Sequence, residues 1–219
     1  MTSTEDAPAE RVPLSRDRVL RGAMAVADAG GIGALTIRTL AQSLGVKPMS
    51  VYYYVASKDE ILDAIVDLVF AEIDLPVAGG PWRVEMARRA NSARQVLRRH
   101  PWATALLQSR TNPGPATLRH HNAVIGSLRE GGFSVEQTAH AFALIDSYVY
   151  GFALSEYALP INGPETVAEV AGSMMKHFPV DDYPYLFEFT VQHVMQPGYD
   201  FGKEFEFGLN LILDGLPGR

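Results

Sequence analysis

The stretch TIRTLAQSLGVKPMSVYYYVASK, Thr36 to Lys58, decides the fold because it predicts two short helices joined by a tight turn. Leu40 and Leu44 lie four residues apart and share one helical face, and the small Ala41 between them allows a second helix to cross closely. Gly45 can adopt the left-handed backbone that ends a helix and reverses the chain. The pattern therefore indicates a helix-turn-helix.

The second of these helices is predicted to begin at Pro48, which suits the first position of a helix, and Val51 and Val55 return it to the core. This leaves a set of residues facing outward: Lys47, Pro48, Met49, Ser50 and Tyr52. In helix-turn-helix proteins such an exposed first turn enters the major groove of DNA, where side chains meet base edges and phosphates. The alternative is an ordinary helical hairpin with a polar surface.

Three consecutive tyrosines, Tyr52 to Tyr54, favour the DNA-binding interpretation. Neighbouring residues on a helix diverge by roughly 100°, so no single face can bury all three rings. Some of the phenol hydroxyls must therefore lie at the surface, where they donate well to phosphate.

The order and spacing of these residues resemble the TetR family of one-component transcriptional regulators. The resemblance is carried by Ala23 to Gly31, Leu35, Thr36, Arg38, Leu40, Ala41, Leu44 to Val46, Val51, Tyr52, Val55, Lys58 and Leu62. It implies that backbone phosphates are bound by Thr36, Arg38, Tyr52, Tyr54 and Lys58, and that bases are read by Pro48, Met49 and Ser50. Two residues depart from the commonest pattern: Met49 is a flexible apolar reader, and Tyr54 stands where the family often has histidine.

Charge is unevenly distributed along the 219 residues, whose formal net charge is −6. Met1 to Glu10 has three acids and no base, Arg11 to Lys58 has seven bases and two acids, and the remainder has twelve bases and twenty acids. A basic front end on an acidic body is consistent with phosphate binding through the front end alone. A surface on which charges are merely mixed is the alternative.

Composition sets the broad class. Apolar residues make up 47% of the chain, enough for a core in one or two domains. No run approaches the roughly 18 apolar residues of a membrane span, and Met1 to Glu10 lacks the apolar centre of a signal peptide. We therefore expect a cytoplasmic protein with no membrane partner. The absence of cysteine excludes disulfides, thiol catalysis and thiolate metal sites.

Proline and glycine residues that interrupt helices mark the boundaries between segments of the chain. Residues 1–14 are expected to be a flexible arm, and residues 15–75 a DNA-binding domain whose first helix starts at a Ser15 cap. Ser57 and Glu60 form a predicted capping box for a long connector helix that runs to Leu75. The segment Pro76 to Pro81 breaks this helix and marks a boundary, after which residues 82–216 form a second domain.

The second domain is also predicted to be helical, so the fold class is all-α. The expected helices are Trp82 to Arg99, Ala103 to Ser109, Ala116 to Glu130, Ser134 to Ala158, Tyr185 to Met195 and Phe201 to Leu213. A crossover, Pro160 to Pro184, joins the helix that ends at Ala158 to the helix that starts at Tyr185, and contains one short helix near Pro164 to His177. No alternating strand pattern competes with this interpretation.

This body resembles the C-terminal regulatory domain of the tetracycline-repressor-like subgroup. The resemblance is carried by Trp82, His100 to Trp102, Gly114, Pro115, Leu128, Gly131 to Phe133, Gly151 and Phe205 to Leu216. It implies a homodimer, in which two helices of each protomer form a four-helix bundle, and an inducer cavity inside each body. The apolar segment Phe142 to Leu154 agrees with a dimer helix covered on both sides, although burial within one monomer is the alternative.

A ligand site requires polar groups set among large apolar side chains. The candidates on converging helices are Trp102, Leu106, His121, Asn122, Ile125, Phe142, Ile145, Asp146 and Tyr148. Each of them alone is more often an ordinary core residue. The apolar, aromatic lining favours a lipophilic or aromatic small-molecule inducer.

Enzymatic function is the contrasting hypothesis, and the sequence disfavours it. It contains no G-x-S-x-G, H-E-x-x-H, P-loop or G-x-G-x-x-G motif, so we expect no catalysis and no cofactor. His120 and His121 are adjacent and diverge on a helix, so we expect no metal site there, and a structural metal held by distant residues is left open. A ligand-independent architectural DNA-binding protein is a third class.

These observations together predict a homodimeric repressor. Its two recognition helices would enter successive major grooves about 34 to 36 Å apart, so its double-stranded DNA operator should be a near-palindrome. A ligand in the body would move the connector helix as a lever and spread the two heads. Repression, as opposed to activation, follows from the resemblance alone.

Overall fold

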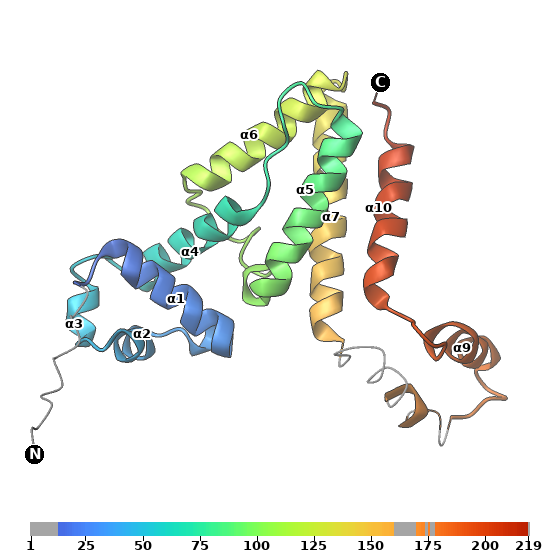
Figure 1. The fold of residues 1–219 in the computed structure, drawn as a ribbon, viewed down its shortest axis with the longest axis horizontal. Helices are drawn as coiled ribbons and strands as arrows, with labels where there is room; N and C mark the ends of the chain where they lie inside the picture. The colour runs from blue at the N-terminus through green and yellow to red at the C-terminus, as the bar shows by residue number, and fades with distance from the viewer. Residues whose placement is uncertain (1–12, 160–169, 174, 176–177, 219) are drawn as a thin grey trace, which may run out of the picture.

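The computed structural model describes residues 13–159, 170–173, 175 and 178–218, and in these it contains helices and no strand (Figure 1). An N-terminal head contains α1 (Arg16–Gly30), η1 (Ile32–Ala34), α2 (Ile37–Leu44) and α3 (Pro48–Val51). The helix α4 (Lys58–Glu72) leads from the head to the body. The body contains α5 (Trp82–Arg99), η2 (Pro101–Ala103), α6 (Pro115–Glu130), α7 (Val135–Ala158) and α10 (Glu204–Gly215).

The predicted helix-turn-helix is confirmed. Gly22 allows α1 and α2 to approach closely, and Gly45 forms the turn after α2. A Cβ at Gly22 of α1 would lie 2.8 Å from Leu44, so the glycine lets α1 and α2 cross closely. Gly45 ends α2 with φ of 68°, in the left-handed region that favours glycine. The amide of Val46 then donates to the carbonyl of Ala41 at 3.0 Å and closes the turn.

The recognition helix is shorter than predicted. α3 ends at Val51, and Tyr52 to Tyr54 form a turn in which the Tyr54 amide donates to the Val51 carbonyl at 3.0 Å. Val55 is buried as expected, but it lies outside the helix. The helix has to stop because Ser57, the N-cap of α4, requires extended backbone only a few residues later.

The connector α4 begins at the predicted cap. The Ser57 hydroxyl accepts from the Glu60 amide at 3.1 Å, but the Glu60 carboxylate accepts from the amide of Ala56 at 2.6 Å, so the capping box is shifted by one residue. That backbone hydrogen bond, together with Arg16, holds the pKa of Glu60 below its usual range. α4 ends before the predicted Leu75, because the chain turns to run along α5, where the Asp74 amide donates to Ser92 at 2.9 Å.

The long helices of the body follow the prediction, and α7 starts with the expected capping box between Ser134 and Gln137. The helix predicted for Ala103 to Ser109 was wrong. After η2 this segment forms consecutive turns, in which Leu106 donates to Ala103 and Ser109 donates to Leu106. Forming the first turn of an α-helix is unfavourable unless several more helical turns follow, and the segment before Pro113 is too short for them.

The C-terminal third is more broken than predicted. In place of one helix, α9 (Pro184–Phe189) continues into a π-helical turn, η3 (Thr190–Val194), and a 3₁₀ turn, η4 (Phe201–Lys203), precedes α10. Of the short helix predicted near Pro164 to His177, residues 170–173 and 175 are helical and the others lie outside the described residues. Most of the predicted N-terminal arm also lies outside them.

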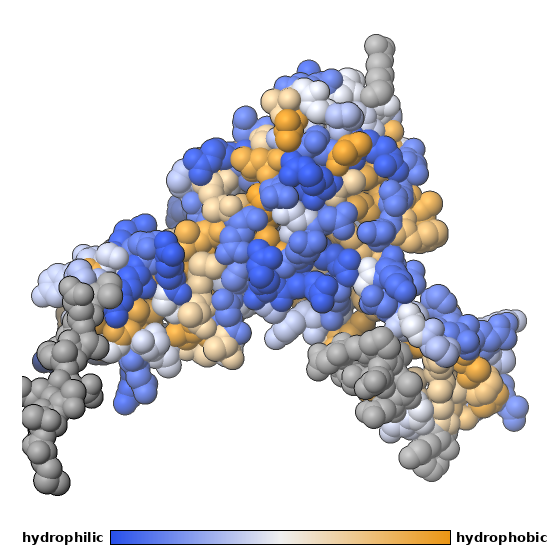
Figure 2. All heavy atoms as spheres, in the orientation of Figure 1, coloured by the Kyte–Doolittle hydropathy of each residue, from blue (hydrophilic) through white to orange (hydrophobic). Residues whose placement is uncertain are grey.

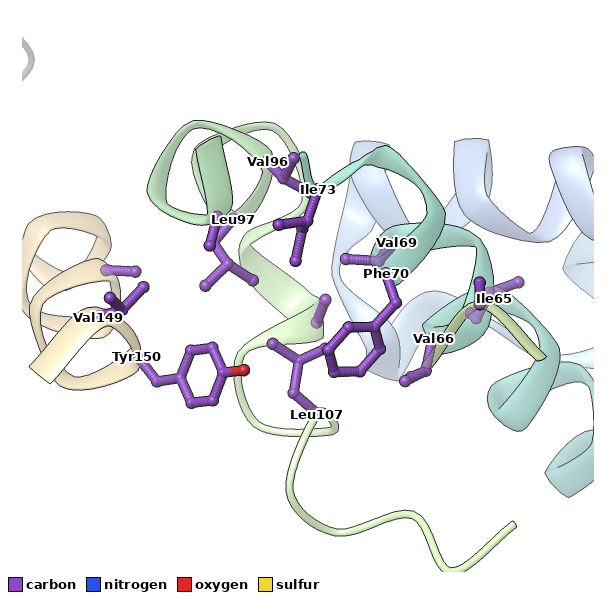
Figure 3. Close-up of a cluster of buried hydrophobic side chains, with 14 of the residues drawn as sticks. Ile65, Val66, Val69, Phe70, Ile73, Val96, Leu97, Leu107, Val149 and Tyr150 are labelled. Carbon is purple, nitrogen blue, oxygen red and sulfur yellow. The ribbon is translucent and has the colours of Figure 1, made fainter. Parts of the chain in front are cut away.

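The core joins α4 to the body. Ile65, Val66, Val69 and Phe70 of α4 belong to one cluster of buried side chains with Val96, Leu97, Leu107, Val149 and Tyr150 (Figure 3). Because interiors are close-packed, α4 cannot shift without repacking against its neighbours α1 and α6. None of the helices in the described residues combines the length and hydropathy that a bilayer crossing requires.

Candidate DNA interface and ligand site

The residues predicted to bind DNA gather at the α2 and α3 end of the head and at the start of α4. Those that are exposed are Thr36, Arg38, Lys47, Pro48, Met49, Tyr52 and Lys58, while Ser50 and Tyr54 are half-buried. Met49, one of the three predicted base readers, leaves 70% of its surface exposed, so its side chain is accessible to a partner.

Three of these residues carry charges that no described residue neutralises. Arg38, Lys47 and Lys58 form no ion pair with any residue that the structure describes, whereas Arg16 pairs with Glu60 at 3.0 Å. An unpaired cation at the surface can bind phosphate without first breaking an internal bond. The head therefore offers a set of free positive charges around α3.

Two residues differ from the predicted DNA-binding set: Thr36 has a structural role as well, and Tyr53 is exposed although no role was predicted for it. The Thr36 hydroxyl accepts from the Thr39 amide at 3.1 Å and caps α2, so its oxygen already has a structural role. Tyr53 was given no role, yet it is 86% exposed, more than either neighbouring tyrosine. The sequence contained the signal, since three adjacent rings cannot share one buried face.

An acidic stripe on α4, which sequence reasoning missed, ties the connector to the body. Asp59, Asp63 and Asp67 lie four residues apart, so they share one helical face. Asp67 accepts from the amide and hydroxyl of Thr117 at 2.8 and 2.9 Å and so caps α6, while Asp63 and Asp59 pair with Arg110. These contacts attach the start of α6 and the loop before it to α4.

A second contact joins the head directly to the body. Asp28 on α1 accepts from the Trp102 indole at 2.6 Å and lies 2.7 Å from Nδ1 of His100, whose Nε2 lies 3.3 Å from Glu72 on α4. Trp102 was predicted to line the ligand site, but the structure places its polar atom at this head–body contact.

Four of the predicted ligand residues come together between α6 and α7. The rings of His121 and Phe142 lie 5.5 Å apart, and Phe70 of α4 lies 5.3 Å from His121. Ile145 and Asp146 are buried one turn further along α7. The aromatic cluster thus includes a residue of the connector helix.

Beneath these rings lies a buried polar network whose main members sequence reasoning missed. Arg89 of α5 is fully buried, donates through Nη1 to Asp146 and donates through Nε to Nε2 of His120 at 3.0 Å. The Tyr150 hydroxyl donates to the other oxygen of Asp146 at 3.3 Å. The available signal was a long cation on the apolar face of α5, between Met86 and Ala93.

Burial sets the protonation states in this network. It lowers the pKa of His120 to about 3, with the charge of Arg89 adding to the effect, and it lowers the pKa of His121 as well. Burial also raises the pKa of Tyr150, with the Asp146 charge adding to that shift. The imidazole of His120 is therefore neutral at physiological pH. An isolated buried charge costs far more than a paired one, which explains why Arg89 and Asp146 occur together.

The remaining predicted ligand residues lie elsewhere. Tyr148 stacks on Phe205 at 5.5 Å and donates to the backbone of α10, so it packs the body rather than facing the aromatic cluster. Asn122 and Ile125 are exposed, and Leu106 is half-buried. A pocket of about 540 Å³ lies where the start of α5, the end of α6 and the end of α10 meet, and none of the predicted ligand residues lines it. In the described residues no cluster of His, Asp and Glu could hold a metal.

Apolar side chains are exposed along α7 and α10. They include Leu144, Leu154, Tyr157, Phe207 and Leu211, of which Phe207 and Tyr157 are each 67% exposed. Figure 2 shows hydrophobic surface beside α10 and on the arm that carries α9. Surface of this kind marks an interaction site.

The chain is similar to known transcriptional regulators. Residues 19–65 match the bacterial regulatory proteins of the tetR family, and residues 75–219 match the tetracyclin repressor-like C-terminal domain. It is 35% identical over 144 residues to an HTH-type transcriptional regulator of Saccharopolyspora erythraea, covering 65% of this chain and 61% of that protein. It is 32% identical over 212 residues to the HTH-type transcriptional repressor DrrR1 of Streptomyces coeruleorubidus, covering 93% of this chain and 77% of that one.

A solved structure is similar over nearly the whole fold. The TetR family protein ActR of Streptomyces coelicolor, crystallised in complex with (S)-DNPA, superposes with a TM-score of 0.75 at 28% identity, covering 94% of this chain and 98% of that chain. The helix-turn-helix head, the helical body and the two family matches agree, and the chain therefore belongs to the TetR family of transcriptional regulators.

Proposed function

We propose that this chain is a cytoplasmic homodimeric repressor that binds a near-palindromic operator and is released by a lipophilic or aromatic small molecule. In this proposal residues 15–75 read the DNA, residues 82–216 bind the ligand and form the dimer, and no residue is catalytic. The similarity to the repressor DrrR1 supports repression, and the ligand complex of ActR supports a ligand in the body.

The single observation that carries the proposal is the double role of α4. This helix leads directly from the DNA-binding head, and its Phe70 also lies 5.1 and 5.3 Å from the rings of His120 and His121 on α6. Asp67 of the same helix caps the N-terminus of α6. A ligand that displaces the aromatic cluster would therefore move α4, and with it the head.

The DNA contacts proposed are electrostatic and direct. Lys58, Arg38 and Tyr52 would bind phosphates, and Met49 and Ser50 would contact base edges in the major groove. Lys47, Pro48, Tyr54 and Thr36 would complete the interface, with Thr36 also holding α2 in place. The basic residues of the head that pair with no described acid, and the acidic residues of the body, support DNA binding through the head alone.

The dimer is proposed to form through α7 and α10. The exposed apolar side chains of these helices, Leu144, Leu154 and Leu211 among them, would pack against their counterparts across a two-fold axis. A two-fold protein fits a two-fold operator, because each head then meets the same half-site.

Release from DNA tests the proposal. Fluorescence anisotropy would follow a labelled duplex, recovered by selection from a random pool, while a library of aromatic and lipophilic compounds is added. We expect some compounds to release the wild-type protein and to raise its melting temperature at the same concentrations, because binding stabilises the folded state. If compounds that raise the melting temperature never change DNA affinity, the lever mechanism is wrong. If none binds and DNA binding persists, a ligand-independent DNA-binding protein replaces the proposal.

A further inference from the structure

One histidine lies between two carboxylates at the contact between the head and the body. Nδ1 of His100 lies 2.7 Å from Oδ1 of Asp28 on α1, and Nε2 lies 3.3 Å from Oε2 of Glu72, the last residue of α4. The imidazole is 9% exposed, whereas the Asp28 and Glu72 side chains are 33% and 35% exposed. A single ring of the body therefore meets both the head and the connector helix.

The number of hydrogen bonds in this contact depends on the proton of His100. An ionised carboxylate only accepts, and a neutral imidazole carries one N–H and one lone pair, so it can donate to only one of the two acids. The other ring nitrogen would then direct its lone pair at a negatively charged oxygen. The imidazolium carries an N–H on both nitrogens, so only the protonated ring donates to Asp28 and Glu72 at once.

The charges that face the ring also favour its protonated form. Arg99 of α5 pairs with Glu72 at 2.8 Å, whereas Asp28 accepts from the neutral indole of Trp102 at 2.6 Å, so a proton on His100 supplies positive charge on that side. Burial acts to raise the pKa of Glu72, but the hydrogen bonds and charges of Arg99 and His100 hold it below its usual range. Glu72 therefore stays ionised near neutral pH, where histidine is the side chain that changes charge.

Loss of the proton weakens both sides of the contact. One hydrogen bond disappears, and the other loses the positive charge that makes such bonds roughly twice as strong as neutral ones. Asp28 lies in the last turn of α1, and α1 crosses α2 closely where Gly22 meets Leu44. The helix that supports the helix-turn-helix is thus attached to the body through a group that can titrate.

We propose that His100 is a proton-dependent clamp between the head and the body. Its imidazolium holds α1 and the end of α4 against the body, and the neutral ring lets α1 separate from the body more often. The DNA-binding head is therefore attached more firmly in mildly acidic solution than in mildly alkaline solution.

The titration of His100 tests the two carboxylate contacts. NMR of ¹⁵N-labelled imidazoles in the full-length protein, without DNA, would follow each ring from pH 5 to 9, and the His100 signals are identified by their loss in His100→Gln. In Asp28→Asn and in Glu72→Gln, His100 should give up its proton at a lower pH than in the wild type, because each change keeps an acceptor but removes a negative charge. The exposed His140 of α7 should titrate alike in every protein.

Amide hydrogen exchange tests the attachment of α1. Exchange rates of peptides from Arg16 to Gly30 at pH 6 and pH 8, divided by the intrinsic rates at each pH, give the protection of this helix. The ratio of protection at pH 6 to protection at pH 8 should be about threefold to tenfold larger in the wild type than in His100→Gln, the effect of one charge-assisted hydrogen bond between partly exposed groups. The effects of the other histidines cancel in this comparison, and the control His140→Gln should keep the wild-type ratio. Circular dichroism would confirm that each variant is folded.

The outcomes decide the clamp independently of the proposed function. A titration of His100 that stays unchanged in Asp28→Asn or in Glu72→Gln overturns the two-sided contact. The same protection ratio in the wild type and in His100→Gln means that the proton does not fasten the head, and this also overturns the clamp. Because neither measurement uses DNA or a ligand, either failure leaves the proposed function intact.

Discussion

Acidification should destabilise the body through His120. Burial lowers the pKa of this side chain to about 3, against 6.5 for an exposed histidine, so the unfolded chain takes up a proton that the folded chain refuses. Stability from this group is fully present above pH 6.5 and is lost as the pH falls toward 3. The two pKa values correspond to a loss of about 2 kcal/mol at pH 5 and under about 1 kcal/mol at pH 6.

Urea unfolding at fixed protein concentration, at pH 8, 7, 6 and 5, would measure this loss. The matched variants are His120→Gln, which removes the titrating group but keeps an acceptor for Arg89, and His140→Gln at an exposed position of α7. Between pH 6 and 5 the free energy of unfolding of the wild type and of His140→Gln should fall more steeply than that of His120→Gln, by about 1.2 kcal/mol. His121, whose pKa burial also lowers, leaves a smaller slope in every protein.

Parallel slopes for the wild type and His120→Gln would refute this reasoning. They would mean that His120 is protonated in the folded protein or is not buried beside Arg89. The neutral state of the His120 imidazole in the folded protein would then be wrong.

Three further predictions concern the surfaces of the molecule. Lys58→Ala should weaken DNA binding and reduce the slope of log affinity against log salt by about 2 per dimer, whereas Arg119→Ala on α6 should leave that slope unchanged. Asp28→Ala should lower the free energy of unfolding by about 1 to 3 kcal/mol, because two buried donors of the body lose their acceptor; an unchanged urea midpoint would contradict the contact. Leu211→Glu should convert dimers to monomers in sedimentation velocity, whereas Leu118→Glu, on α6, should not; a Leu211→Glu dimer would mean that α10 is not in the interface.

Local signals in the sequence predicted the head well. Gly45, the Ser15 cap and the apolar pairs of α2 act within a few residues of one another, so their effect can be determined without knowing the rest of the fold. The end of α3 could not be predicted in this way, because Ser57 sets it from the next helix.

The aromatic cluster and the polar network beneath it were predicted only in part, because their members come from four helices. His121, Phe142 and Asp146 were among the residues predicted from the sequence, since polar and aromatic residues on apolar helices are visible there. Arg89 was not, because its burial depends on a carboxylate 57 residues away. Tyr148, also predicted from the sequence, lies outside this cluster, because its ring stacks on Phe205 of α10.

The acidic stripe of α4 is a periodic signal whose meaning depends on tertiary structure. Three aspartates at intervals of four usually form a solvated face. Here they meet Arg110 and the first turn of α6, which approach from the loop before that helix. Periodicity indicated the shared face but not what covers it.

Selection of bound duplexes from a random DNA pool tests the central claim most directly. We expect one near-palindromic motif whose half-sites lie about 10 base pairs apart, one turn of the double helix, as two heads in successive major grooves require. Tyr52→Phe with Lys58→Ala should recover the same motif at lower affinity, since those side chains are proposed to bind phosphate and not bases. Persistent binding without any enriched motif, or no binding by folded protein, would contradict the assignment of the head as an operator reader.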